Sequence, residues 1–122
     1  MDMPTGFVAP DEHSLQNNMA RIIQSQITQG GSLNTEIPGL SLLRCDEPTV
    51  CEPSIYSPVL AFVIQGSKLV ELGDQEKLYG SLTYAACNIH LPVRCSIVEA
   101  SEAEPFLALK IALDSEEVTS LL

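Results

Sequence analysis

The stretch from Val59 to Gly73 constrains the fold more than any other part of the sequence. It reads V-L-A-F-V-I-Q-G-S-K-L-V-E-L-G, in which an uncharged run rich in Val, Ile and Phe reaches Gly66-Ser67 and continues to Leu72. Such runs on either side of a glycine are typical of two strands joined by a tight turn. Glycine adopts a positive φ without steric cost, so we predict a type II′ hairpin in which Gln65 pairs with Lys68.

The two strands of this stretch differ in polarity. The first is apolar at both alternating sets of positions, which predicts cover on both of its faces. The second carries Lys68 and Glu71, and these charges predict one exposed face. A further turn at Gly73 to Glu76 returns the chain through Lys77 to Tyr79. We therefore predict a three-stranded meander that forms the wall of a β-barrel or sandwich.

Charge limits the classes of partner. Six Lys and Arg stand against 16 Asp and Glu, which gives a formal net charge of -10. A surface this negative repels the phosphates of nucleic acids and anionic lipid head groups, so we expect no direct DNA binding by this segment. The N-terminus lacks a basic region followed by an apolar run, and no stretch approaches the roughly 20 apolar residues that span a bilayer. We therefore expect a cytoplasmic location and no membrane partner.

The four cysteines, Cys45, Cys51, Cys87 and Cys95, form no C-x-x-C pair, and we interpret them as reduced, small buried hydrophobes. Cys87 and Cys95 flank the Leu91-Pro92 corner, where a hairpin would bring them near each other. A two-residue loop would place Cys87 opposite Ser96, whereas a three-residue loop would place it opposite Cys95. The sequence leaves this register open.

One amphipathic helix is predicted over residues 14–29. Ser14 is suited to cap its first turn, and Gly30-Gly31 ends it. Its apolar side chains recur at helical spacing and are Leu15, Met19, Ile22, Ile23 and Ile27. Two interpretations of this stripe are open: it packs against the sheet, or it is the contact of a homodimer.

The rest of the chain predicts short strands. About seven of them, spaced by turns between residues 37 and 113, predict an all-β barrel or sandwich. Three prolines between Asp46 and Pro58 predict an edge strand or a loop there, because proline removes a backbone donor. A strand over Gly80 to His90 is expected to turn at Leu91-Pro92, and Phe106 to Leu113 alternates most clearly. Residues 114–122 predict the start of a short C-terminal helix, so we expect a flexible arm over 1–13 and one domain over 14–122.

Few residues suggest catalytic chemistry. His13 and His90 are the only histidines and are far apart, and the sequence has neither a G-x-S-x-G motif nor a glycine-rich phosphate loop. We predict no catalytic residue, no metal and no cofactor. His90 is interpreted either as a polar strand-end residue or as a member of a ligand pocket at the mouth of the barrel. The pocket residues in the second interpretation are Phe62, Tyr84, His90 and Arg94.

Several motifs together resemble a known family. They are I-P-G-L-S-L-L-R-C-D-E-P-T at Ile37 to Thr49, Y-S-P-V-L-A-F-V-I-Q-G-S-K at Tyr56 to Lys68, G-D-Q-E-K-L-Y-G at Gly73 to Gly80, L-P-V at Leu91 to Val93, and E-A-S-E-A-E-P-F-L-A-L-K-I-A-L-D at Glu99 to Asp114. In this order and spacing they are similar to the N-terminal domain of AraC-type transcription regulators, over about two thirds of the chain.

The resemblance implies a mainly β fold, a cupin-like β-barrel or jelly roll that senses a small-molecule effector and forms a homodimer. It also implies that DNA is bound by a helix-turn-helix half, which this sequence lacks. Two other classes of function are weighed beside it. One is a free-standing cupin-type metal enzyme, which the lack of clustered histidines disfavours, and the other is a plain interaction domain without a ligand-sized cavity.

Overall fold

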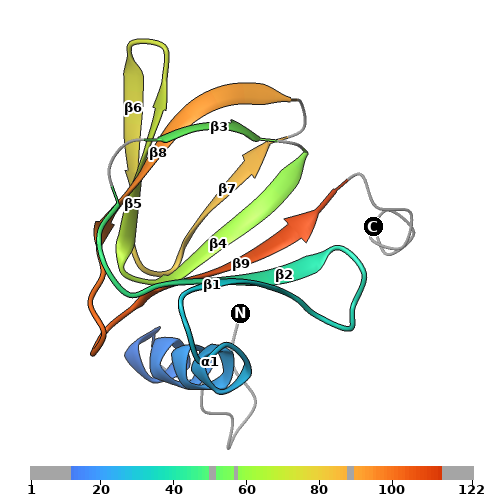
Figure 1. Cartoon of the computed structure of the whole chain (residues 1–122), viewed down its shortest axis with the longest axis vertical. Coiled ribbons are helices and arrows are strands. Elements are labelled where there is room, and N and C mark those ends of the chain that lie inside the picture. Colours follow the sequence, from blue (N-terminus) through green and yellow to red (C-terminus); the bar gives the residue numbers. More distant parts are fainter. Residues whose placement is uncertain (1–11, 50–51, 57, 88–89, 114–122) are drawn as a thin grey trace, which may run out of the picture.

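The computed structural model describes residues 12–49, 52–56, 58–87 and 90–113 (Figure 1). One helix precedes a series of strands in this part of the chain. The elements are α1 (Glu12–Gln26), β1 (Gly31–Asn34), β2 (Leu40–Cys45), β3 (Glu52–Tyr56), β4 (Val59–Gln65), β5 (Ser67–Leu72), β6 (Gln75–Tyr79), β7 (Thr83–Cys87), β8 (Leu91–Glu99) and β9 (Phe106–Ala112). The predicted C-terminal helix and most of the predicted N-terminal arm lie outside the described residues.

The strands form two antiparallel sheets that face each other (Figure 1). The first sheet has the order β1-β2-β9-β4-β7 and the second has the order β3-β8-β5-β6. Neighbours in each sheet are mostly distant in sequence, as in a jelly roll. The prediction of a mainly β, cupin-like barrel preceded by a helix is confirmed. Strand β3, which contains Pro53, pairs with β8 alone and lies at an edge of its sheet, as the prolines of this stretch predicted.

The predicted hairpin at Gly66 is wrong. β4 pairs with β7 and β9, whereas β5 pairs with β6 and β8, so the chain passes from one sheet to the other at this glycine. Gly66 does adopt a positive φ, of 81°. A Cβ at this position would lie 2.4 Å from the carbonyl oxygen of Glu99 and 3.0 Å from the Cα of Phe106. The glycine therefore permits a close crossing of two backbone segments rather than a two-residue turn.

The predicted turn after Gly73 is present, but it is shorter than the predicted span from Gly73 to Glu76, since Gln75 and Glu76 belong to β6. Leu72 pairs with Gln75, so Gly73 and Asp74 form a two-residue hairpin loop between β5 and β6. Gly73 has a φ of 62° and occupies the first central position. The expected exposure of β5 is wrong at Lys68, which is only 6% exposed because it faces the interior between the two sheets.

The predicted turn at Leu91-Pro92 is also wrong, because both residues belong to β8 and pair with β3. β7 and β8 lie in different sheets, so they form no hairpin. Cys87 is opposite Val59, and Cys95 is opposite Val70. Neither of the two registers considered for Cys87 and Cys95 therefore occurs. β1 was not predicted either, since its sequence is short and polar.

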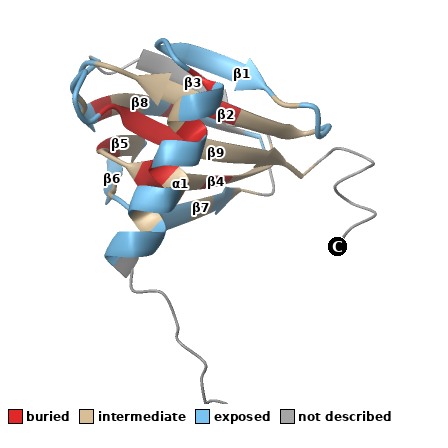
Figure 2. Cartoon of the chain, turned by 90° about the horizontal axis from the view of Figure 1, so that it is seen from below, coloured by how far each residue is buried: buried red, intermediate tan, exposed pale blue. Residues whose placement is uncertain are grey.

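Helix α1 begins two residues earlier and ends three residues earlier than predicted. It lies across the outer face of the first sheet, with its exposed side turned away from the strands (Figure 2). Ala20 and Ile23 of the helix, together with Ile27 directly after it, form a core cluster with Leu42, Ile64 and Leu107. Two polar contacts fix it: Gln16 donates to the carbonyl of Ile64 at 3.1 Å, and Arg44 donates to the carbonyl of Ile27 at 3.2 Å.

A second core cluster lies between the sheets. Val63, Phe106 and Ala108 of the first sheet pack there against Ile97 of the second. The first sheet is thus apolar on both faces, one covered by α1 and the other by the second sheet. Among the described residues, no helix is long and apolar enough to cross a membrane.

The crossing predicts that alanine is tolerated much less well at Gly66 than at Gly73. Gly66→Ala combines a positive φ with a backbone clash and should lower the free energy of unfolding by more than about 3 kcal/mol, or prevent folding. Gly73→Ala meets no atom within 4 Å and should cost only about 1 kcal/mol. Urea denaturation of both variants checks the difference, and equal losses would contradict the assigned crossing.

Two neighbouring isoleucines of α1 should respond differently to truncation. Ile23 is 6% exposed and Ile22 is 62% exposed. Ile23→Ala opens a cavity in the core under the helix and should cost about 2–4 kcal/mol of stability. Ile22→Ala removes surface contacts and should change stability by less than about 0.5 kcal/mol. Urea denaturation midpoints, compared between variants with equal m-values, measure both changes. A large loss of stability in Ile22→Ala would contradict the assignment of the Ile23 face of α1 to the sheet.

Candidate functional site

The inward face of the second sheet is identified by its register. Ile97 lies in the core between the sheets, and Lys68 pairs with it directly. Side chains of a strand alternate between the two faces, so Val70 follows Lys68 on the inward face. Its partners across the sheet, Cys95 and Lys77, share that face.

The inward face of the first sheet carries small side chains around one lysine. Lys110 follows the buried Ala108 on β9, and it pairs with Ser41 on one side and Ala61 on the other. Ala61 pairs in turn with Ala85 on β7. Apart from Lys110, this row fills little of the space between the sheets.

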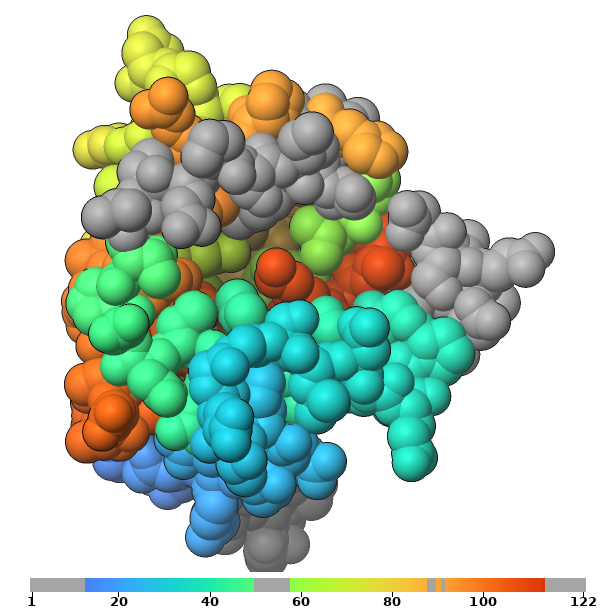
Figure 3. Space-filling model, viewed as in Figure 1, coloured from blue at the N-terminus to red at the C-terminus, as the bar shows by residue number. Residues whose placement is uncertain are grey.

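A cavity of about 330 Å³ lies where β5, β6 and β7 meet. Its walls include Val70, Leu72, Lys77, Tyr79, Ala85 and Val93. The volume is within the range of small-molecule pockets, which begins near 300 Å³. On the face shown in Figure 3 the surface is also hollowed beside β2, and atoms of β4 (green) and β9 (red) are visible inside this hollow.

All three lysines of the sequence occupy inward positions: Lys68, Lys77 and Lys110. Burial lowers the pKa of the Lys68 ammonium, the nearby charge of Lys110 lowers it further, and Cys95 acts in the opposite direction. Lys77 Nζ lies 5.5 Å from the centroid of the Tyr79 ring, a cation–π distance. Lys68 is buried and Lys110 is half-buried, whereas Lys77 remains exposed at the edge of the cavity beside Glu76.

Cys45, Cys87 and Cys95 are half-buried thiols at inward positions. Burial raises the pKa of Cys45; the charge of Asp46 acts in the same direction and that of Lys110 opposes it. This thiol is therefore held in its protonated form at neutral pH. The cysteines were interpreted as reduced, small buried hydrophobes, but the three described ones are only half-buried, and Cys51 lies outside the described residues.

The aromatic residues predicted to line a pocket lie on the outer face of the first sheet. Phe62 packs against the core beneath α1, and its ring centroid is 5.7 Å from that of Tyr84. Tyr84 is 63% exposed. Arg94 lies opposite Glu71 on the outer face of the second sheet, and His90 is exposed between β7 and β8. The structure thus brings Phe62 and Tyr84 together and places Arg94 on the other side of the molecule.

The residues predicted as a dimer contact divide into two groups. Ile23 and Ile27 are buried in the core under α1, and Met19 packs against that core. Leu15 and Ile22 remain 43% and 62% exposed. The inward lysines were missed as site residues, although a lysine in the otherwise small and apolar row of Phe106, Ala108, Lys110 and Ala112 was the available signal.

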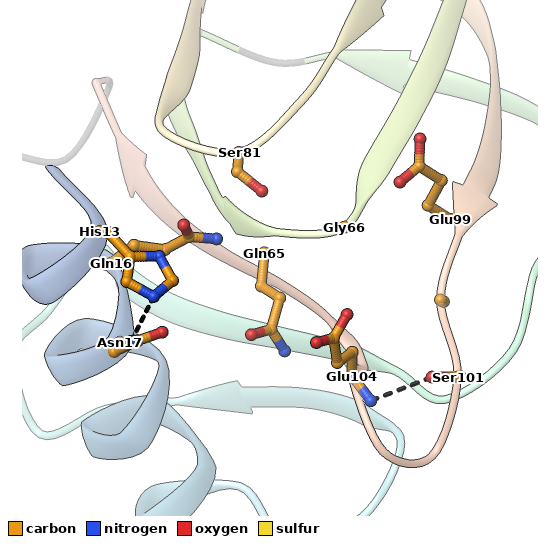
Figure 4. A pocket seen from close by; sticks show the side chains of 10 residues that line it. His13, Gln16, Asn17, Gln65, Gly66, Ser81, Glu99, Ser101 and Glu104 are labelled. Atoms are coloured by element: carbon orange, nitrogen blue, oxygen red, sulfur yellow. Dashed lines mark hydrogen bonds between the residues drawn. The ribbon is translucent and has the colours of Figure 1, made fainter.

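A second cavity, of about 400 Å³, is polar and lies between the first turns of α1 and the Gly66 crossing. Figure 4 shows its lining side chains, among them His13, Gln16, Asn17, Gln65, Ser81, Glu99, Ser101 and Glu104. Gln65 donates to the carbonyl of Pro105 at 2.9 Å, and Gln16 is bound to the backbone of β4. Both amides therefore hold the crossing and the helix in place, which is a structural role.

In the four described stretches of the chain, no group of three or more His, Cys, Asp or Glu side chains is arranged to hold a metal ion. The arrangement between β5, β6 and β7 instead combines a largely apolar cavity with the polar side chains of Gln75, Glu76 and Lys77. Such a combination suits the binding of a small organic molecule.

Solved structures with a similar fold include cupin proteins. The alignment with a cupin-2 domain protein from Shewanella frigidimarina covers 75% of this chain and 90% of that protein's chain, with a TM-score of 0.53 and 12% sequence identity. A cupin superfamily protein from Desulfitobacterium hafniense matches 92% and 94%, with a TM-score of 0.52 and 17% identity. Drosophila melanogaster CENP-C, solved bound to CAL1, matches 83% and 98%, with a TM-score of 0.51 and 12% identity. At these identities the similarity concerns the fold alone.

The comparison with curated proteins found no significant match. The sequence model of the AraC-type transcriptional regulator N-terminus matches residues 36–122, which is most of the chain. The match includes all strands from β2 to β9 and therefore both sheets around the cavity. The chain belongs to the family of AraC-type transcriptional regulator N-termini.

Proposed function

We propose that this chain is the effector-sensing and dimerisation part of an AraC-type transcription regulator, with a small molecule bound between its two sheets. The observation that carries the proposal is the cavity of about 330 Å³ between β5, β6 and β7. Its aliphatic walls supply burial, and the few polar groups at its rim supply orientation. DNA contact would belong to a helix-turn-helix part of the regulator, since the net charge of -10 opposes it here.

The position of the cavity suits a sensor. It lies between strands of different sheets, so a ligand there contacts β5 and β6 on one side and β7 on the other. β6 and β7 are edge strands of their sheets and are not paired with each other. A ligand that fills the gap would link these edges, and such a differential contact is what a conformational response requires.

A screen of small metabolites should find at least one that raises the melting temperature. A ligand that binds only the folded protein stabilises it by about 2.7 kcal/mol at a hundredfold excess over Kd. Ala85→Phe places a ring in the cavity and should abolish the shift caused by that ligand. Leu78→Phe is the matched control, because Leu78 is 56% exposed on the outer face of β6.

Two outcomes would contradict cavity binding. One is the absence of any stabilising ligand from the screen. The other is a ligand whose effect survives Ala85→Phe while the unliganded variant keeps the far-UV circular dichroism spectrum of the parent protein.

Dimerisation is proposed through the exposed flank of α1. Ile22 and Leu15 are close on the helix surface, one helical repeat of seven residues apart, and both remain exposed. The exposed Tyr84 ring adds apolar surface on the same outer face of the first sheet, next to Phe62 under the helix. A second copy of the chain would cover this surface, which water contacts in the monomer.

Ile22→Glu should therefore weaken the dimer without unfolding the protein. Sedimentation equilibrium at micromolar concentration should show a shift from dimer to monomer, because a buried carboxylate without a partner opposes association. Leu78→Glu adds the same charge at a similarly exposed apolar position, on β6 of the second sheet away from α1, and should leave the dimer largely intact. A parent protein that stays monomeric throughout would remove dimerisation from the proposal.

A further inference from the structure

The polar cavity between the first turns of α1 and the Gly66 crossing has the size of a small-molecule site. Its volume is about 400 Å³, and such sites begin at about 300 Å³. Its walls come from four parts of the chain: α1, the crossing itself, the loop between β6 and β7, and the end of β8 with the loop that follows. A molecule in this cavity is therefore bounded on several sides.

The hydrogen-bonding groups of this cavity are rich in acceptors. Glu99 and Glu104 contribute carboxylates, whereas neither lysine nor arginine is among the lining residues. Gln16 donates its amide N–H to a backbone carbonyl of β4, and Gln65 donates its own to the carbonyl of Pro105. A carbonyl only accepts, so the nitrogen end of each amide is engaged there, and the oxygen end remains an acceptor.

The side chains extend into the cavity from different elements. Figure 4 shows Gln16 of α1, Ser81 of the loop after β6 and Glu104 of the loop after β8 directed toward a common space. His13 and Asn17, also on α1, are hydrogen-bonded to each other at 3.2 Å and complete the wall on the helix side. A ligand in this space meets acceptor groups from several directions.

The electrostatic balance of the cavity favours a cation. The N-terminal end of α1 carries about half a positive charge from the helix dipole, which by itself attracts anions. The carboxylates of Glu99 and Glu104 bring two full negative charges and outweigh it. In the part of the chain that the structure describes, the single ion pair joins Arg44 to Asp46, so neither glutamate is neutralised by a salt bridge there. The net charge of -10 adds a long-range attraction for cations.

We infer that this cavity binds a small organic amine whose ammonium group is held by the carboxylate of Glu104, with the amide oxygen of Gln16 and the hydroxyl of Ser81 as further acceptors. An ammonium has three N–H donors and no acceptor, which matches a site rich in acceptors. Charge-assisted hydrogen bonds to a carboxylate are also stronger than neutral ones. The carboxylate of Glu99 gives the cavity a second position for an amine that carries more than one ammonium group.

This site is separate from the cavity between β5, β6 and β7, because the two have no lining residue in common. The amine would contact α1 and the loop between β8 and β9 together, and so link the helix to the barrel. The exposed flank of α1 is the surface proposed for dimerisation. A bound amine would therefore stabilise the docked position of the helix that carries this surface.

The test titrates the protein with butylamine, putrescine and spermidine, which carry one, two and three ammonium groups. Butanol and the diol with the carbon skeleton of putrescine are the uncharged counterparts, and potassium chloride keeps the ionic strength constant. Isothermal titration calorimetry should show saturable binding of at least one amine. Its Kd should be at least roughly tenfold lower than that of the uncharged counterparts, because hydrogen bonds to charged groups are the stronger ones.

Glu104→Gln removes the charge and keeps the size of the side chain, and it should raise the Kd of the bound amine at least roughly tenfold. Glu102→Gln is the matched control, because it makes the same change at an exposed position of the same loop that does not line the cavity. It should leave the Kd within about twofold. Both glutamates are exposed, so both variants should fold, which far-UV circular dichroism without ligand checks.

The inference fails on any of three results. The first is the absence of saturable binding for all three amines, and the second is equal affinity for an uncharged counterpart. The third is an equal effect of Glu104→Gln and Glu102→Gln, which would show a general attraction of cations to an acidic chain rather than a site.

Discussion

The close crossing of backbone at Gly66 is the contact on which the two-sheet arrangement depends. Because glycine has no side chain, the end of β4 can pass close to the backbone of Glu99 and Phe106. A Cβ at Gly66 would lie 2.4 Å from the carbonyl oxygen of Glu99 and 3.0 Å from the Cα of Phe106. Phe106 is fully buried beside it, so the sheets are tightly packed at this end. The cavity lies further along the same strands, where β5 has run on to Val70 and Leu72. The two sheets are therefore tightly packed at the Gly66 crossing and separated by the cavity further along β5.

Local sequence patterns predicted the strands but not all of their partners. A positive φ was expected at Gly66 and a turn was expected at Gly73, and both glycines have a positive φ. Gly73 joins the paired strands β5 and β6, whereas Gly66 joins β4 and β5, which belong to different sheets. The local sequences around the two glycines do not reveal this difference. The difference arises from contacts distant in sequence, such as β4 with β9 and β5 with β8. Register and sheet membership are set by that long-range packing.

Alternation identified two faces of each strand but not which face is inward. In a sheet with one solvent-exposed face, the apolar residues of the alternating pattern identify the buried face. In the first sheet both faces are apolar, because α1 covers the outer one, so Phe62 and Ala61 were equivalent in the pattern. In the second sheet Lys68 was expected to be exposed, since lysine usually is. The cavity therefore became visible only when both sheets were placed.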